Sequence, residues 1–136
     1  MKRKKIWTYV SPKKPKTKPS ELLKIDVQEK ANELVNTVLK SAYIQPPPEN
    51  PKYNYITDIY TKWHGSYFYF YAIYFSPFPD VISPTFESGF ARLEYIGKNQ
   101  FSLSYMRHTG QWNEIYSGLS LDECLSMIKD EVHFGL

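Results

Sequence analysis

The chain has 136 residues, of which 42% are hydrophobic and 17% aromatic, with a formal net charge of +3. This length supports one domain that buries roughly two-thirds of its unfolded surface. A single cysteine, Cys124, excludes an intramolecular disulfide framework. The longest apolar and aromatic run, residues 67–75, is too short for a membrane helix, and the first lysines precede no signal-peptide core. We therefore expect a cytoplasmic protein that does not enter a membrane.

Positive charge is concentrated at the N-terminus, where residues 2–18 contain no acidic residue. The basic residues of this segment are Lys2, Arg3, Lys4, Lys5, Lys13, Lys14, Lys16 and Lys18. The remaining nine basic and fourteen acidic residues leave the rest of the chain with a net charge of −5. Residues 1–19 have too little apolar content to offset the entropy of ordering. We interpret them as a mobile basic arm, with residues 20–136 forming a single domain.

Two functions of the basic arm are open. A flexible segment with eight positive charges attracts phosphate through counterion release, which favours nucleic acid as a partner. Alternatively, the arm is a solvated tail that keeps an aromatic-rich protein soluble, or it folds back on the acidic surface of its own domain.

A first helix is expected from near Pro19 or Asp26 to Lys40. Its apolar side chains recur on one helical stripe: Val27, Ala31, Leu34, Val35 and Val38. Asp26 is a credible N-cap, although Ser20 could start an earlier turn. The following segment QPPPENP, residues 45–51, predicts an extended connector because proline suits neither a helix interior nor a central strand.

Residues 53–75 hold about half of the aromatic side chains and predict a β-hairpin. Gly65 supplies the positive φ that a two-residue turn with Ser66 needs at its first position. The second strand alternates, so its two faces differ. One face carries Tyr67, Tyr69 and Tyr71, and the other carries Phe68, Phe70 and Ala72. The phenylalanine face belongs in the core.

The second half of the chain predicts three further strands and a helix. Residues 76–89 contain three prolines and indicate a long loop. Strands are expected over residues 90–96 and 101–108, with a turn at 97–99, and a short strand follows over 112–116. The last helix begins at the capping box formed by Ser120 and Glu123 and ends before Gly135. Cys124 lies on its apolar stripe and is expected in the core.

This order of elements predicts an α+β fold with an N-terminal helix, an antiparallel meander sheet of four to five strands and a C-terminal helix. Each helix has one apolar stripe, so both should cover the same face of the sheet. The other face is then aromatic and polar. Its expected members are Tyr67, Tyr69, Tyr71, Arg92, Glu94, Ser102, Ser104 and Met106.

The tyrosine row allows two further hypotheses. Aromatic side chains on an open sheet face stack nucleic-acid bases, at about 1–3 kcal/mol per base. This favours an auxiliary nucleic-acid-binding protein that uses the basic arm together with Tyr67, Tyr69, Tyr71 and Arg92. Alternatively, the face is covered by protein, whether residues 76–89, Trp7 and Tyr9, or a second copy of the chain. The domain is then a protein-interaction module or a homodimer.

Catalytic motifs are absent from the sequence, which has no phosphate-binding glycine loop, no H-E-x-x-H and no C-x-x-C. The three histidines are far apart and lack acids at metal-ligand spacing. His108 and Glu114 could face each other across a turn as a general base and its partner, but we favour a polar hairpin end in which His108 is solvated and Arg107 pairs with a carboxylate. We therefore expect no enzyme, no metal and no cofactor.

Five segments in order resemble a family of small bacterial proteins of unknown function. They are WTYVSPKKP near the start, DIYTKW at 58–63, FARLEY at 90–95, YMRHTGQW at 105–112 and GLSLDEC at 118–124. The resemblance implies a bacterial cytoplasmic protein whose basic arm is native. It implies no activity and assigns no functional residue.

Overall fold

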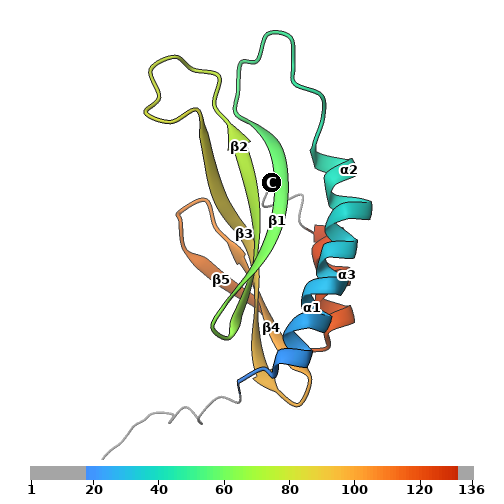
Figure 1. Ribbon diagram of the computed structural model, residues 1–136. Helices are drawn as coiled ribbons and strands as arrows, with labels where there is room; N and C mark the ends of the chain where they lie inside the picture. The colour runs from blue at the N-terminus through green and yellow to red at the C-terminus, as the bar shows by residue number, and fades with distance from the viewer. Residues whose placement is uncertain (1–17, 132–136) are drawn as a thin grey trace, which may run out of the picture.

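A computed structural model describes residues 18–131 of the chain. The five strands form one antiparallel sheet in the order β1-β2-β3-β4-β5, so that each strand pairs with its neighbour in sequence. The predicted α+β fold and meander sheet are confirmed (Figure 1). The elements are α1 (Glu21–Leu34), the π-helical segment η1 (Val35–Leu39), α2 (Lys40–Tyr43), β1 (Tyr55–His64), β2 (Tyr67–Phe75), β3 (Thr85–Gly97), β4 (Gln100–Met106), β5 (Trp112–Leu119) and α3 (Leu121–Glu131).

The first helix is continuous through α1, η1 and α2. Its N-cap is Ser20, whose Oγ accepts a hydrogen bond from the Leu23 backbone N–H at 3.1 Å. The prediction of Asp26 as the N-cap was wrong, because Asp26 lies inside the helix, and the alternative start at Ser20 is confirmed. The helix also continues to Tyr43, three residues beyond the predicted end. It stops shortly before Pro46, since a residue that precedes proline is disfavoured in the helical conformation.

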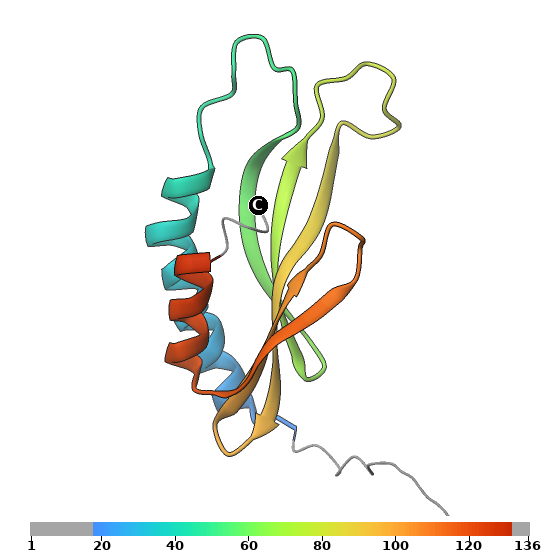
Figure 2. The ribbon, with the colours of Figure 1, turned by 180° about the vertical axis from the view of Figure 1, so that it is seen from behind.

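Both helices cover the same face of the sheet, with α1 beside α3 (Figure 2). Phe68, Phe70 and Ala72 are fully buried beneath them, as predicted. The predicted core position of Cys124 is confirmed as well, at 0% exposure. The other fully or almost fully buried apolar residues are Val27, Ala31, Val35, Leu39, Ile59, Phe90, Ala91, Leu93, Phe101, Leu103 and Ile128.

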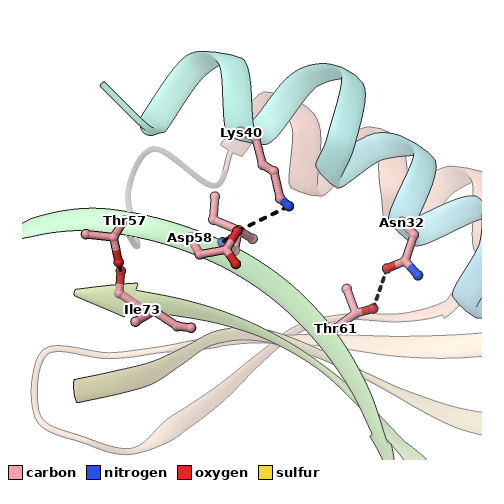
Figure 3. Close-up of polar contacts among 7 residues, drawn as sticks. Asn32, Lys40, Thr57, Asp58, Thr61 and Ile73 are labelled. Atoms are coloured by element: carbon pink, nitrogen blue, oxygen red, sulfur yellow. Dashed lines mark hydrogen bonds and ion pairs between the residues drawn. The ribbon is translucent and has the colours of Figure 1, made fainter. Parts of the chain in front are cut away.

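Two polar contacts fix strand β1, at the edge of the sheet, to the first helix (Figure 3). The Thr61 hydroxyl donates a hydrogen bond to the Asn32 side-chain oxygen at 2.6 Å. Further along the helix, just beyond η1, the Lys40 ammonium lies 3.2 Å from the Asp58 carboxylate. This ion pair is partly exposed and contributes at most about 1 kcal/mol. Together they anchor the edge strand at two points.

Strand β3 begins earlier than the sequence indicated. The loop after β2 covers only residues 76–84, so the prediction of a loop to residue 89 was wrong. Residues 85–89 pair with β2, and Phe86 stacks on Tyr74 with ring centroids 5.2 Å apart. All three prolines of this region, at 77, 79 and 84, lie before the strand. The backbone hydrogen bonds between β2 and β3 can therefore extend as far as Thr85, the residue after Pro84.

Strand β4 ends at Met106, two residues before the predicted end. Arg107 leaves the ladder because its N–H donates to the Gln111 carbonyl and its carbonyl accepts from the Gly110 N–H, both at 2.8 Å. These bonds close the predicted turn around Gly110, which has φ +86°. Strand β5 then continues to Leu119, beyond its predicted end at residue 116.

Cys124 supplies a prediction about stability at alkaline pH. Burial raises the pKa of its thiol from the ordinary value of 9.0 to about 12. Between about pH 9 and pH 12, the Cys124 thiol has therefore lost its proton in the unfolded chain but keeps it in the native protein. The free energy of unfolding should therefore fall above pH 9, by up to about 1.4 kcal/mol per pH unit.

Urea unfolding at several pH values tests this expectation, with Cys124→Ala as the matched variant. Between about pH 9 and 10, the free energy of unfolding of Cys124→Ala should fall less steeply than that of the parent protein. This range is chosen because it lies below the ordinary pKa of tyrosine, so that tyrosine titration contributes little. An identical decline in both proteins would contradict it.

Candidate binding site on the aromatic sheet face

The side of the sheet opposite the helices carries a cluster of aromatic side chains. Cross-strand pairing brings Tyr60 beside Tyr71, His64 beside Tyr67 and Arg92 beside Tyr69. Within residues 18–131, no helix lies over this side (Figures 1 and 2). We call it the aromatic face and define it by Tyr60, His64, Tyr67, Tyr69, Tyr71, Arg92, Met106 and Trp112.

The predicted site residues are only partly brought together. Tyr67, Tyr69, Tyr71 and Arg92 share the aromatic face, and all four are partly buried. Lys18 is exposed. The other seven lie outside the described residues: Lys2, Arg3, Lys4, Lys5, Lys13, Lys14 and Lys16.

The tyrosine rings pack against one another in a row. Tyr60 stacks on Tyr71 with centroids 5.1 Å apart, and Tyr71 stacks on Tyr69 at 5.7 Å. Tyr67 continues the row at 6.1 Å from Tyr69, with its ring tilted by 44°. Each ring therefore shields part of the next one. The four rings therefore form one continuous row of contacts.

Arg92 connects this row to Trp112. Its guanidinium carbon lies 4.4 Å from the Tyr67 ring centroid and 4.8 Å from that of Trp112, within cation–π distance of both. The Arg92 Nε is buried and finds no hydrogen-bond acceptor among the described residues. The two rings position the guanidinium and offset part of the free-energy cost of removing it from water.

Trp112 borders a hollow that was not expected from the sequence. The hollow has a volume of about 430 Å³ and is lined by His64, Tyr69, Tyr71, Gly89, Met106 and Trp112. Gly89 is closely approached by two of the other lining residues, because a Cβ there would lie 3.2 Å from Trp112 Cζ2 and 3.4 Å from Tyr71 Cε1. A side chain at this position would therefore require the Trp112 ring to move by a few tenths of an ångström or more.

Gly89→Val should therefore displace the Trp112 indole and lower the free energy of unfolding by about 1–3 kcal/mol, as overpacking does elsewhere. Nuclear magnetic resonance can follow the indole N–H signal of Trp112, which should move. The Trp63 signal is the internal control, because its N–H donates to the Lys24 carbonyl at 3.1 Å. A Trp112 signal that stays in place would show that the ring does not need the glycine.

Charged side chains of both signs lie near the aromatic face. Tyr60 donates its hydroxyl hydrogen bond to Glu87, and this bond is the main reason that the pKa of Tyr60 rises to about 12. Glu114 pairs with Ser104 and is exposed on the same side. Lys62 is an exposed cation of the adjoining edge strand. The edge of the face thus presents both signs of charge.

The hypothetical pairing of His108 with Glu114 was wrong. The strand register places Glu114 opposite Ser104, whereas His108 lies in the turn beyond the last pair, Met106 and Trp112. Both side chains are exposed. Within residues 18–131, no group of three histidine, cysteine or acidic side chains is arranged to hold a metal ion.

These features define a small α+β domain with two helices on one side of a five-stranded meander sheet and, on the other side, an aromatic face that no helix of residues 18–131 covers. In the described part of the chain, no helix has the length and hydropathy needed to cross a membrane.

The chain belongs to the DUF3024 family, a domain of unknown function whose family model matches residues 19–134. The expected membership of an uncharacterised family is confirmed, although the WTYVSPKKP segment lies outside the matched range. No curated protein and no solved structure shows a significant match to the chain.

Proposed function

We propose that this chain is an auxiliary binding protein for single-stranded nucleic acid in a bacterial cytoplasm, without catalytic activity. The observation that supports this most is the hollow lined by Tyr69, Tyr71 and Trp112, on a sheet face that no helix of residues 18–131 covers. A nucleobase is flat and apolar on both sides, so it can stack on such rings whatever its identity. Arg92, held beside Trp112, adds positive charge to one wall.

Phosphate contacts must come from outside this hollow, because Glu87 and Glu114 lie near the aromatic face. The basic arm is the natural source. Lys18, its last basic residue, lines a small pocket together with Gly65 and Ser66 of the β1–β2 turn. The arm is thus attached at one end of the aromatic face. From there it can run alongside a bound single strand of nucleic acid.

Trp112→Ala tests the stacking contact. Binding of a fluorescein-labelled dT oligonucleotide of about 12 nucleotides is measured by anisotropy at about 50 mM salt. Loss of one stacked base should weaken binding by about 1–3 kcal/mol, or roughly 5- to 150-fold. Phe78→Ala is the control, since Phe78 is an aromatic residue in the loop after β2 and is 44% exposed. Equal affinity of Trp112→Ala and the parent protein would contradict stacking in the hollow.

A second function is a protein-interaction module, with a homodimer packed through the tyrosine face as its simplest form. It is favoured by the continuous tyrosine row and by exposed apolar side chains near the end of the β2–β3 hairpin, Phe78, Val81, Ile82 and Phe86. Light scattering over a range of concentrations should then give twice the chain mass of 16.0 kDa. Tyr69→Glu should restore the monomer. A parent protein that stays monomeric at high concentration would exclude this function.

A further inference from the structure

The aromatic face resembles a polyproline-binding surface in its chemistry, and the chain carries a matching ligand. Residues 12–16 read Pro-Lys-Lys-Pro-Lys, in which two prolines are three positions apart. We propose that this segment of the chain's own basic arm docks in the hollow bordered by Tyr69, Tyr71 and Trp112. The inference goes beyond nucleic-acid binding, because it assigns an internal ligand to the face.

The point where the arm joins the domain favours this docking. Lys18 and Pro19 line a pocket of about 280 Å³ together with Gly65 and Ser66. This turn is flanked by His64 and Tyr67, the first cross-strand pair of the aromatic face. The arm is therefore tethered directly beside the face on which it is proposed to lie.

The arm is long enough to reach from the β1–β2 turn to the hollow. A strand rises about 3.3 Å per residue, so Tyr71, five residues beyond Ser66, lies about 17 Å from the turn. An extended chain advances by up to about 3.3–3.6 Å per residue, so residue 12 can reach roughly 20 Å from Lys18. Residues 12–16 can thus lie over the hollow without any rearrangement of the sheet.

The chemistry of the face fits the same segment. Proline-rich segments favour an extended left-handed helix that binds to aromatic-lined grooves at little entropic cost. Lysine ammonium groups are attracted to tyrosine and tryptophan rings. The same face already holds one cation in this way, the Arg92 guanidinium, which lies within cation–π distance of Tyr67 and Trp112. Glu87 and Glu114 add carboxylates near the rings.

The tether strengthens a contact that is weak by itself. A short flexible linker gives its attached ligand an effective concentration in the millimolar range. A free peptide of this sequence with a Kd of about 1 mM would therefore be docked about half of the time when attached. Neither tight binding nor a large buried area is required.

The helix side offers a competing site for a basic segment. The groove between α1 and α3 has a volume of about 360 Å³ and includes Glu33 and Asp122 among its lining residues. It also contains Lys30 and Lys129, and no aromatic ring lines it among the described residues. The aromatic face is the better match, and an experiment must separate the two positions.

Paramagnetic relaxation in the full chain makes this distinction. Cys124 is fully buried, so a Ser11→Cys variant can be spin-labelled selectively. At about 20 mM salt, the amide signals of Tyr69, Tyr71 and Trp112 should lose at least about twofold in intensity. At about 1 M salt, where the Debye length is about 3 Å, most of the loss should disappear.

The matched variants are Lys13→Glu with Lys14→Glu in the arm, and Glu87→Gln with Glu114→Gln on the domain. Each pair should reduce the broadening on the aromatic face. Unaffected amide signals on that face, or broadening centred on the α1–α3 groove, would overturn the proposal. Broadening that also appears when the label and the observed domain are on different molecules would overturn docking within one chain.

Addition of the dT oligonucleotide then separates this inference from the proposed function. If the oligonucleotide displaces the label from Tyr69 and Trp112, the result supports both the docked arm and base stacking in the hollow. Broadening that persists at saturating oligonucleotide supports the docked arm and contradicts base stacking in the hollow.

Discussion

Phe70→Ala is expected to lower the free energy of unfolding by about 3–5 kcal/mol, because it leaves a cavity in the centre of the core. Phe70 is fully buried on β2, with its ring centroid 5.5 Å from that of Phe68 and 6.0 Å from that of Phe90. Its backbone pairs with Thr61 on one side and Ala91 on the other, so neighbouring strands limit collapse around the cavity. Domains of this size are stable by about 5–15 kcal/mol. The substitution should therefore remove at least about a fifth of the stability of the domain, and nearly all of it if the parent lies at the low end of this range.

Urea unfolding followed by circular dichroism measures this effect, and Ile82→Ala is the matched control. Ile82 is completely exposed in the loop between β2 and β3, so its truncation should change stability by no more than about 0.5 kcal/mol. If Phe70→Ala and Ile82→Ala unfolded at the same urea concentration, the placement of Phe70 in the core would be wrong.

The core and the order of elements could be predicted from the sequence because they follow from local periodicity. Alternation in β2 separates Phe68 and Phe70 from Tyr67, Tyr69 and Tyr71, and pairing with β3 keeps the two sets on opposite faces. The capping box at Ser120 is equally local, and both of its hydrogen bonds are present, at 2.8 and 3.1 Å. Such features need no knowledge of distant neighbours.

The hollow could not be predicted, because it depends on strands that are far apart in sequence. Trp112 lies on β5 and Gly89 on β3, yet the indole lies only 3.2 Å from the position that a Gly89 Cβ would take. The register that brings them together includes a bulge opposite Phe70 and Tyr71, which no local pattern reveals. The only available signal is a glycine just before an alternating strand, and a glycine in that position is equally typical of the end of a loop.

Arg92 shows the same limit for a predicted site residue. Its alternation with Leu93 placed it correctly on the aromatic face. Its surroundings were not predictable, since the guanidinium lies between rings from β2 and β5. The side chain already has aromatic partners, so its contribution to phosphate binding should be smaller than that of an arm lysine. Salt-dependent affinity is therefore expected to depend mainly on the arm.

Binding of single-stranded nucleic acid should weaken steeply with salt. If all eight basic residues of the arm contact phosphates, the logarithm of the association constant falls against the logarithm of salt concentration with a slope of roughly −5 to −6. Raising salt from about 50 to 200 mM then reduces affinity by about 1,000- to 4,000-fold. Anisotropy of the dT oligonucleotide over this range measures the slope directly.

Removal of residues 1–18 should flatten this slope and abolish most of the affinity at low salt. The deletion stops before Pro19, which is buried, and keeps the Ser20 cap of the first helix, so the domain should remain folded. A full-length chain with the eight basic residues replaced by glutamine is the matched control, because it keeps the length and the prolines of the arm. If the arm contributes affinity through its positive charge, the deletion and the glutamine variant bind the oligonucleotide equally weakly. A parent slope near zero, or affinity unchanged by the deletion, would mean that the arm does not bind phosphate and would leave the protein-interaction module as the function of the aromatic face.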